Sequence, residues 1–264
     1  MSRIFITGSA DGLGQMAARL LIEEGHQVVL HARNEKRGKE ALTLAPGAEA
    51  VVTGDLSSIA ETREVASQVN RLGRFDAVIY NAAIGYREPK KLKTIDGLPH
   101  IFAVNTLAPY ILTALIKKPK RLVYLSSGLH QGADTSLRDM LWEGRRWDGT
   151  GAYSETKFHD ALLAFAVARL WPDVFSNALE PGWVLTKMGG PGAPDDLNKA
   201  HRTQAWLAVS NDPNALVSGK YFYHKRLRTP NTATYDIKKQ NELLNQCQEL
   251  TGIALDPFHQ DSRD

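Results

Sequence analysis

Thr7-Gly8-Ser9-Ala10-Asp11-Gly12-Leu13-Gly14 joins the apolar run Arg3–Thr7 to the amphipathic stretch Leu13–Glu24. The first run predicts a strand, and the helical spacing of apolar residues in the second predicts a helix. Gly8 permits a tight turn, Gly12 lets the backbone approach a pyrophosphate, and Gly14 lets the helix pack against the strand. Free N–H groups at the helix N-terminus attract phosphates. We therefore interpret the stretch as a dinucleotide site, with a glycine-rich surface turn as the alternative.

Short β-branched runs alternate with helical patterns along the chain, which predicts an α/β fold: a Rossmann-type doubly wound parallel sheet of about seven strands, with helices on both faces. The expected strands are Arg3–Thr7, Gln27–His31, Glu49–Thr53, Asp76–Tyr80, Lys120–Ser126, Val174–Leu179 and Lys220–Tyr223. The expected helices are Leu13–Glu24, Lys36–Leu44, Ser58–Leu72, a long one from about Leu98 to Lys117 that Pro109 must kink or bound, and Tyr153–Leu170.

No repeat or linker divides the chain, so we expect residues 1–264 to form a single NAD(P)-binding domain. Two segments lack a regular pattern, Gly128–Gly151 and the Gly/Pro-rich Gly189–Pro194. Long irregular segments in compact domains are often functional. We expect substrate loops near residues 128–152 and 186–200.

The composition excludes several classes of protein. The net charge is only +3 with scattered basic residues, which argues against nucleic-acid binding. The one cysteine, Cys247, excludes an internal disulfide and a cysteine zinc site, and we expect no metal. No run reaches about 18 apolar residues, so no membrane span is expected. The N-terminus lacks the features of a secretory signal, which favours a cytoplasmic protein.

The end of the second expected strand indicates which nicotinamide cofactor binds. An acidic residue there holds a free ribose 2′-OH, whereas a 2′-phosphate needs positive charge. Arg33 follows this strand, no carboxylate does, and Lys36 and Arg37 add nearby charge. Its planar guanidinium suits a phosphate, so we expect NADP(H) in preference to NAD(H). The alternative is an ordinary solvated arginine.

A Tyr-x-x-x-Lys motif supplies candidate chemistry for carbonyl reduction. A tyrosine can donate the proton if a cation lowers its pKa, and a lysine four residues later on a helix lies on the same face. The chain has four matches: Tyr86/Lys90, Tyr153/Lys157, Tyr221/Lys225 and Tyr235/Lys239. Pro89 disfavours a helix at the first, the third lies in an expected strand, and the fourth follows the last strand without a serine upstream.

Tyr153/Lys157 has the best context, because Ser126-Ser127 ends the preceding strand at the edge where ligands bind. This arrangement, with the Thr-Gly-x-x-x-Gly-x-Gly turn, resembles the short-chain dehydrogenase/reductase family. The resemblance implies a nicotinamide cofactor in a doubly wound sheet. It also implies that Ser127, rather than Ser126, hydrogen-bonds the substrate oxygen. The implied catalytic residues are Tyr153, Lys157, Ser127 and Asn105.

The resemblance continues through shorter elements. Gly54-Asp55-Leu56 matches the family's adenine contact, Asn81-Ala82-Ala83-Ile84 a degenerate Asn-Asn-Ala-Gly element, and Pro181–Thr186 its Pro-Gly element. One departure is Asp11, where many NADP-using relatives have a basic residue. The implied cofactor-binding residues are Gly8, Ser9, Asp11, Gly12, Leu13, Gly14, Arg33, Asp55, Leu56, Asn81, Ala82, Ala83, Tyr153, Lys157, Pro181, Gly182, Val184 and Thr186.

Ser127 and Tyr153 are 26 residues apart, farther than in the commonest family members. This spacing resembles the branch that contains retinol-dehydrogenase-like and light-dependent reductase-like proteins. We expect the extra segment to cover a substrate, and its apolar residues suggest a lipophilic carbonyl compound; simple packing is the alternative. The pocket candidates are Met140, Trp142, Trp147, Trp183 and Met188.

The expected function is an NADP(H)-dependent oxidoreductase that interconverts a small-molecule carbonyl and an alcohol. A non-enzymatic NADP(H)-binding sensor of the same fold is the alternative, and a sugar-nucleotide epimerase would need a larger C-terminal domain. The helix Tyr153–Leu170 is apolar around much of its circumference. Relatives pair through this helix, so we expect a homodimer or homotetramer, unless the helix is buried within one chain.

Overall fold

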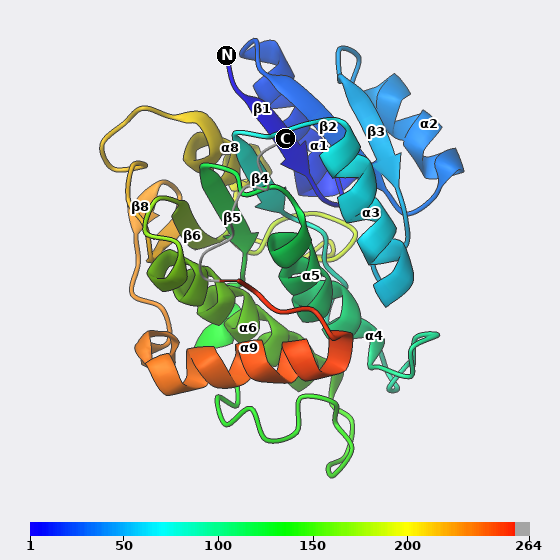
Figure 1. Ribbon diagram of the computed structural model, residues 1–264, viewed down its shortest axis with the longest axis vertical. Helices are drawn as coiled ribbons and strands as arrows, with labels where there is room; N and C mark the ends of the chain where they lie inside the picture. The colour runs from blue at the N-terminus through cyan, green and yellow to red at the C-terminus, as the bar shows by residue number, and fades with distance from the viewer. Residues whose placement is uncertain (257–264) are drawn as a thin grey trace.

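The computed structural model describes residues 1–256 and places one eight-stranded sheet among them (Figure 1). The strand order is β3-β2-β1-β4-β5-β6-β7-β8; all neighbours are parallel except β7 and β8. The predicted doubly wound α/β fold is confirmed, with one short strand more than expected. The strands are β1 (Arg3–Ile6), β2 (Gln27–Ala32), β3 (Ala50–Thr53), β4 (Ala77–Tyr80), β5 (Arg121–Leu125), β6 (Phe175–Glu180), β7 (Lys220–Tyr223) and β8 (Arg226–Leu227).

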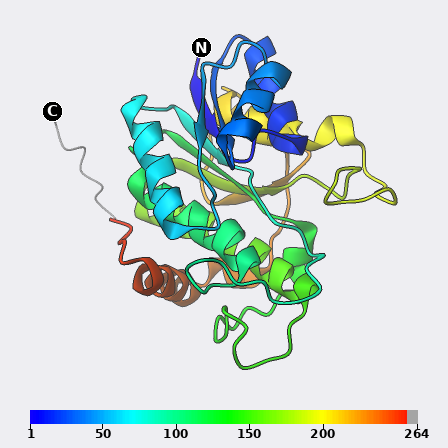
Figure 2. The same ribbon diagram turned by 90° about the vertical axis from the view of Figure 1, so that its right-hand side faces the viewer.

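Helices cover both faces of this sheet, as Figure 2 shows in side view. Side chains alternate along each strand, so Ile4 and Ile6 pack beneath α1, α2 and α8, whereas Phe5 faces α3, α5 and α6. Each face therefore has its own apolar core. The helices are α1 (Gly12–Glu23), α2 (Glu35–Leu44), α3 (Ile59–Arg71), α4 (His100–Phe102), α5 (Ala108–Leu115), α6 (Gly149–Leu170), α7 (Leu197–Ala200), α8 (Arg202–Val209) and α9 (Ile237–Thr251).

The order of the strands reverses between β1 and β4. The chain runs outward from β1 to β3, returns to β4, and continues to β7 on the other side. In open α/β sheets such a reversal leaves a crevice at the carboxyl ends of the strands, where ligands bind. The glycine-rich turn after β1 and the Asn81 turn after β4 both lie at this point.

The expected long helix from Leu98 to Lys117 is divided into three parts. α4 is followed by a π-helical turn, Ala103–Leu107, and then by α5, with Pro109 in its first turn. Proline cannot donate the hydrogen bond that the preceding turn would accept, and its ring crowds that turn. A widened π turn relieves this conflict, and such turns often occur at functional sites.

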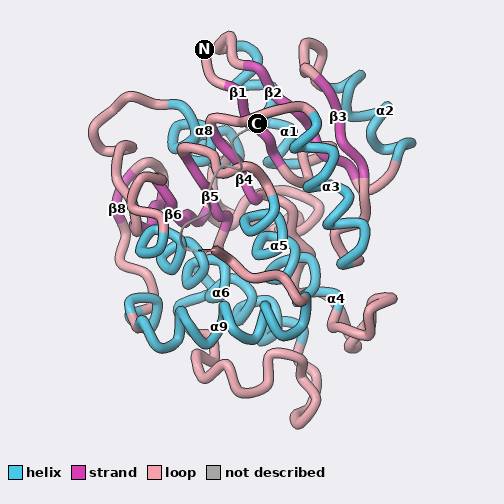
Figure 3. The backbone as a smooth tube through the Cα atoms, viewed as in Figure 1, coloured by secondary structure: helices cyan, strands magenta, loops and turns pink. Residues whose placement is uncertain are grey.

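The C-terminal helix α9, absent from our predictions, packs along α6 (Figure 3). Arg169 of α6 hydrogen-bonds Gln240 and Asn241 of α9, and Phe165 packs edge-on against Tyr235 just before α9. Most of α6 is buried. The apolar surface of α6, from which we expected oligomer formation, is therefore covered within the chain and gives no support to that expectation.

The segment between the 3₁₀ turn Gly128–Gly132 and α6 is anchored by packing. Met140 belongs to the main core, and Trp142 packs with Ile101 and Ala152. Lys91 Nζ donates to the Trp142 carbonyl at 2.7 Å. Met140 and Trp142 therefore pack in the hydrophobic interior, contrary to the expectation that they line a substrate pocket. Within residues 1–256, no helix could cross a membrane, and no cluster of three or more His, Cys, Asp or Glu could hold a metal.

Candidate active site

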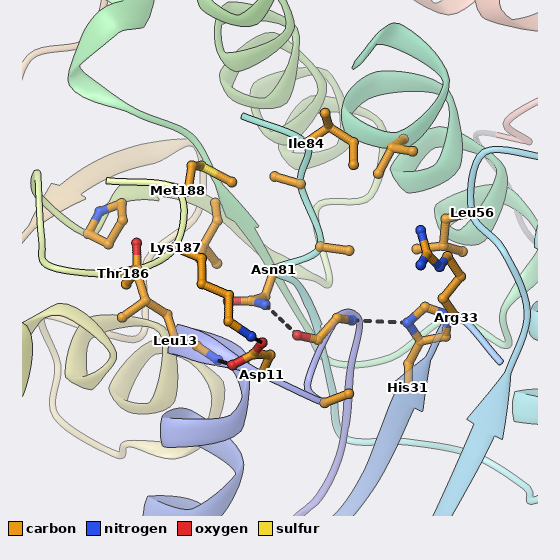
Figure 4. A pocket seen from close by; sticks show the side chains of 18 of the residues that line it. Asp11, Leu13, His31, Arg33, Leu56, Asn81, Ile84, Thr186, Lys187 and Met188 are labelled. Carbon is orange, nitrogen blue, oxygen red and sulfur yellow. Dashed lines mark hydrogen bonds and ion pairs between the residues drawn. The ribbon is translucent and has the colours of Figure 1, made fainter. Parts of the chain in front are cut away.

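A cavity of 650 Å³ opens at the carboxyl ends of β1, β2, β4 and β5 (Figure 4). Its volume lies within the range of ligand-binding clefts. Fourteen of the expected cofactor residues line it: Gly8, Asp11, Gly12, Leu13, Arg33, Asp55, Leu56, Asn81, Ala82, Ala83, Tyr153, Lys157, Pro181 and Thr186. Four others, Ser9, Gly14, Gly182 and Val184, do not.

The glycine turn needs its glycines for two different reasons. Gly8 has φ +63°, and a Cβ there would lie 2.8 Å from Ala82 Cα. A Cβ on Gly14 would lie 2.4 Å from Asn81 Nδ2, so Gly14 permits close packing and does not line the cavity. Gly12 has φ +55° and faces open space. This cradle leaves the N-terminus of α1 open to a diphosphate, so the residues present fit a dinucleotide.

Hydrogen bonds tie the turn to the neighbouring strands. Thr7 Oγ1 accepts the Asn81 N–H at 3.0 Å and the Ala82 N–H at 3.1 Å. Asn81 Nδ2 donates to the Gly8 carbonyl at 3.2 Å. Ser9 is buried. Its hydroxyl donates to the Ile6 carbonyl and accepts the backbone N–H of His31 on β2. Its side chain therefore supports the turn from beneath.

His31 is a site residue that our sequence reasoning missed. Its Nδ1 accepts the Gly8 N–H at 3.0 Å (Figure 4). Its Nε2–H donates to the Gly54 carbonyl at 3.0 Å. This pattern requires the neutral imidazole. Burial, the main cause, lowers the pKa of His31 to about 4, so the ring is neutral at physiological pH. A polar residue ending an otherwise apolar strand was the available clue.

The charges around the turn come from three elements. Asp11 caps α1 by accepting the Gly12 N–H, and it forms ion pairs with Lys187 and with Arg37. The Lys187 ammonium is the main reason that the pKa of Asp11 lies below its ordinary value. Arg33 is exposed at the rim of the cavity. The acidic departure in the turn is therefore offset by basic residues beside it.

The segment after β6 crosses the cavity. Met188 packs against Gly85, and Arg87 Nη2 donates to the Gly189 carbonyl at 3.3 Å. Met188 lines the cavity with Lys187, whereas Trp183 is half exposed and donates through Nε1 to Gly189. Of the expected pocket residues, Met188 alone borders this cavity among the described residues.

Tyr153 lies in the second turn of α6 with its phenol buried at the cavity wall. Burial, the largest effect, raises the pKa of Tyr153, while Lys157 and the Ser127 hydroxyl act to lower it. The net direction is upward, contrary to our expectation that the lysine brings the phenol toward neutrality. The Tyr86 ring meets the Tyr153 ring edge-on, with centroids 5.6 Å apart.

Lys157 is buried one helical turn beyond Tyr153 and holds two partners. Its Nζ donates to the Leu125 carbonyl at 2.8 Å and to Asp160 Oδ2 at 2.7 Å. The two serines after β5 differ in their partners. Ser126 Oγ donates to the Lys157 carbonyl at 2.6 Å, whereas Ser127 is half-buried and interacts with the phenol.

Asn105 lies in the π turn and is completely buried. Its Oδ1 accepts the Ile84 N–H at 2.7 Å, and its Nδ2 donates to the Ile84 carbonyl at 2.9 Å and to Thr156 Oγ1 at 3.0 Å. Asn105 therefore joins the turn after β4 to α6 beside Tyr153. All three bonds therefore reach other elements rather than the helix that carries Asn105.

The other Tyr/Lys pairs lie outside this arrangement. Tyr221 is in β7, Tyr235 precedes α9 in a 3₁₀ turn, and Tyr86 is followed by Pro89. None of their lysines lines the cavity. Tyr153 and Lys157 are the pair that does.

Comparisons with known proteins agree with this geometry. The short chain dehydrogenase family model matches residues 2–121. An uncharacterized oxidoreductase of Emericella nidulans is 47% identical over 97% of this chain and 99% of its own length. The short-chain dehydrogenase chry4 of Gibberella zeae is 44% identical over 97% and 99%. Retinol dehydrogenase 13 of Mus musculus is 28% identical over 96% and 84%.

Solved structures share the fold. A protein of Mycobacterium paratuberculosis superposes with a TM-score of 0.84 at 24% identity, covering 97% of this chain and 95% of that one. A blue fluorescent protein from a metagenomic library, in complex with NADPH, gives a TM-score of 0.68 at 20% identity over 84% and 95%. The chain is therefore an oxidoreductase that belongs to the short-chain dehydrogenase/reductase family.

Proposed function

We propose that this protein is an NADP(H)-dependent oxidoreductase that interconverts a small-molecule carbonyl compound and an alcohol, within one domain. The observation that carries the proposal is the placement of three groups on one cavity. The glycine turn, Arg33 and the buried Tyr153 phenol, with Lys157 one helical turn beyond it, all line this cavity. The expected cytoplasmic location and homo-oligomer stay predictions.

Residues of this chain would hold each part of the cofactor. The open N-terminus of α1 suits the diphosphate, and Arg33 at the rim suits a 2′-phosphate. Asp55 and Leu56 follow β3 and suit the adenine side, while Pro181 and Thr186 follow β6 and suit the nicotinamide side. When bound, the nicotinamide of NADPH supplies a hydride to the carbonyl carbon.

Tyr153 delivers the proton that balances this reaction. Its phenol O–H protonates the carbonyl oxygen, leaving a phenolate that takes a proton from solvent. Ser127 donates a hydrogen bond to the same oxygen, which stabilises the charge that develops there. Lys157 stabilises the phenolate, and Asn105 keeps α6 in place against the turn after β4.

We infer a lipophilic substrate, with residues 186–200 as its covering loop. Lys187 and Met188 already hold this segment against the turns after β1 and β4. A second hollow of 510 Å³ is lined by Tyr86 and Trp147 among others, and the ring of Tyr86 contacts the Tyr153 ring. The name of the similar retinol dehydrogenase 13 refers to a lipophilic alcohol. Of residues 128–152, the part near Trp147 is the one we propose to meet substrate.

Turnover separates this proposal from the alternative of a redox sensor. Purified protein is mixed with NADPH and a panel of lipophilic aldehydes, ketones and quinones, and the loss of NADPH absorbance is followed. We expect saturable oxidation with at least one aldehyde or ketone. Tight NADPH binding by fluorescence with no turnover of any member would support the sensor and contradict the proposal.

A further inference from the structure

A buried carboxylate lies against the lysine of the catalytic pair. Asp160 and Lys157 are each 3% exposed, and Asp160 Oδ2 accepts from Lys157 Nζ at 2.7 Å. They are three residues apart on α6, so the helix itself sets their contact. A lysine has three N–H donors, and two of them are used by Asp160 and by the Leu125 carbonyl. One donor remains for a ligand.

Within residues 1–256, the titratable groups other than Lys157 on which the charge of Asp160 acts are the tyrosines Tyr153 and Tyr124. On α6, Tyr153 lies one turn before Lys157. On β5, burial raises the pKa of Tyr124, and the charge of Asp160 raises it further. Tyr86, after β4, contacts the Tyr153 ring. The Tyr124 hydroxyl bonds Thr113 Oγ1 of α5 at 2.8 Å, so α5 adds a neutral partner.

The net charge of Lys157, Asp160 and Tyr153 decides how readily the buried phenol ionises. With Asp160 ionised, Lys157 and Asp160 cancel, and ionising Tyr153 would leave one net negative charge in a poorly solvated place. With a neutral side chain at 160, Lys157 alone would leave a positive charge that a phenolate cancels. Burial raises the pKa of Asp160 to about 6, so the carboxylate is ionised at neutral pH and above.

We propose that Asp160 is a positioning residue that neutralises the Lys157 ammonium and thereby keeps the Tyr153 phenol protonated. A phenol that stays protonated is a proton donor, so this arrangement favours carbonyl reduction over alcohol oxidation at neutral pH. The preferred direction of the reaction rests on the proposed function. The effect of Asp160 on the pKa of Tyr153 is a property of the folded chain and can be measured without a substrate.

The test is an NMR titration of protein labelled with ¹³C at the tyrosine Cζ. The Tyr153 signal is assigned by its loss in Tyr153→Phe, and its midpoint is compared in wild type and Asp160→Asn. Asparagine keeps the size and an acceptor for Lys157 but removes the charge. We expect the midpoint to fall by about one pH unit or more. Asp173→Asn, which removes an exposed carboxylate from the Lys118 pair, should leave it unchanged.

Equal midpoints in wild type and Asp160→Asn would overturn the inference, because a purely structural aspartate would not move the phenol. If Asp160→Asn does not fold, the wild-type titration decides. Tyr153 should then remain protonated to about pH 10, the ordinary tyrosine value, or beyond. A midpoint below about pH 10 would contradict the inference. Failure of the proposed function would appear separately, as NADPH turnover that survives in Tyr153→Phe.

Discussion

His31 Nδ1 accepts the backbone N–H of Gly8 at 3.0 Å, which fixes the glycine turn to the end of β2. The same ring donates to Gly54 at the end of β3, so one side chain holds three strand ends in register. The bond exists only while the imidazole is neutral. Protonation would remove the acceptor for Gly8 directly beneath the proposed diphosphate site.

His31 should make the protein sensitive to acid. Its pKa falls from 6.5 to about 4 on folding, so the unfolded chain binds the proton first. The stabilisation is complete above pH 6.5 and is lost as pH falls toward 4, by about 3 kcal/mol in all. Denaturant unfolding of His31→Gln between pH 4 and 7 should show a flatter dependence than wild type. His224→Gln, on the β7–β8 turn, is the control, and an unchanged slope in His31→Gln would contradict the assignment.

Gly14→Ala should destabilise the protein and weaken cofactor binding. The added methyl would lie 2.6 Å from the Gly8 carbonyl oxygen and closer still to the Asn81 amide, so the turn must shift. Overpacking of this kind costs about 1–3 kcal/mol. Gly132→Ala, where a Cβ meets nothing within 4 Å, is the matched control. Thermal unfolding and NADPH titration check both variants; equal behaviour of the two would show that the close approach is unimportant.

Arg33→Ala should reduce the preference for NADPH over NADH. A charge-assisted hydrogen bond is worth about 1.5–3 kcal/mol, so the Kd for NADPH should rise roughly ten- to a hundredfold. Binding of NADH, which lacks the phosphate, should change little. Lys36→Ala is the control, because Lys36 is exposed nearby but does not line the cavity. A parallel loss for both cofactors in Arg33→Ala would refute a role in phosphate recognition.

The sequence predicted what depends on local pattern. All seven expected strands were placed to within one residue at each end. The residues of the glycine turn are close together in the sequence, and so are Tyr153 and Lys157. Their relation to β1, β5 and α6 followed from the order of elements. These features could be predicted because period, spacing and capping act over a few residues.

The features that the sequence did not predict depend on contacts between residues that are far apart in the chain. The partners of His31 come from the turns after β1 and β3, and no spacing in the sequence specifies them. The covering of α6 by α9 and the burial of Met140 are tertiary contacts of the same kind. The ion pair of Asp160 with Lys157 could have been predicted from the sequence, because a carboxylate three residues after a lysine on an apolar helix suggests such a pair.

Tyr153 is the proposed proton donor, and Tyr153→Phe tests this role directly. Single-turnover oxidation of bound NADPH by the aldehyde or ketone found active is measured in this variant and in Tyr235→Phe, whose phenol lies in the exposed turn before α9. Loss of general acid catalysis should slow Tyr153→Phe by about 10²–10⁴-fold, with NADPH binding retained and Tyr235→Phe unaffected. Hydride transfer at the wild-type rate in Tyr153→Phe would contradict the assignment.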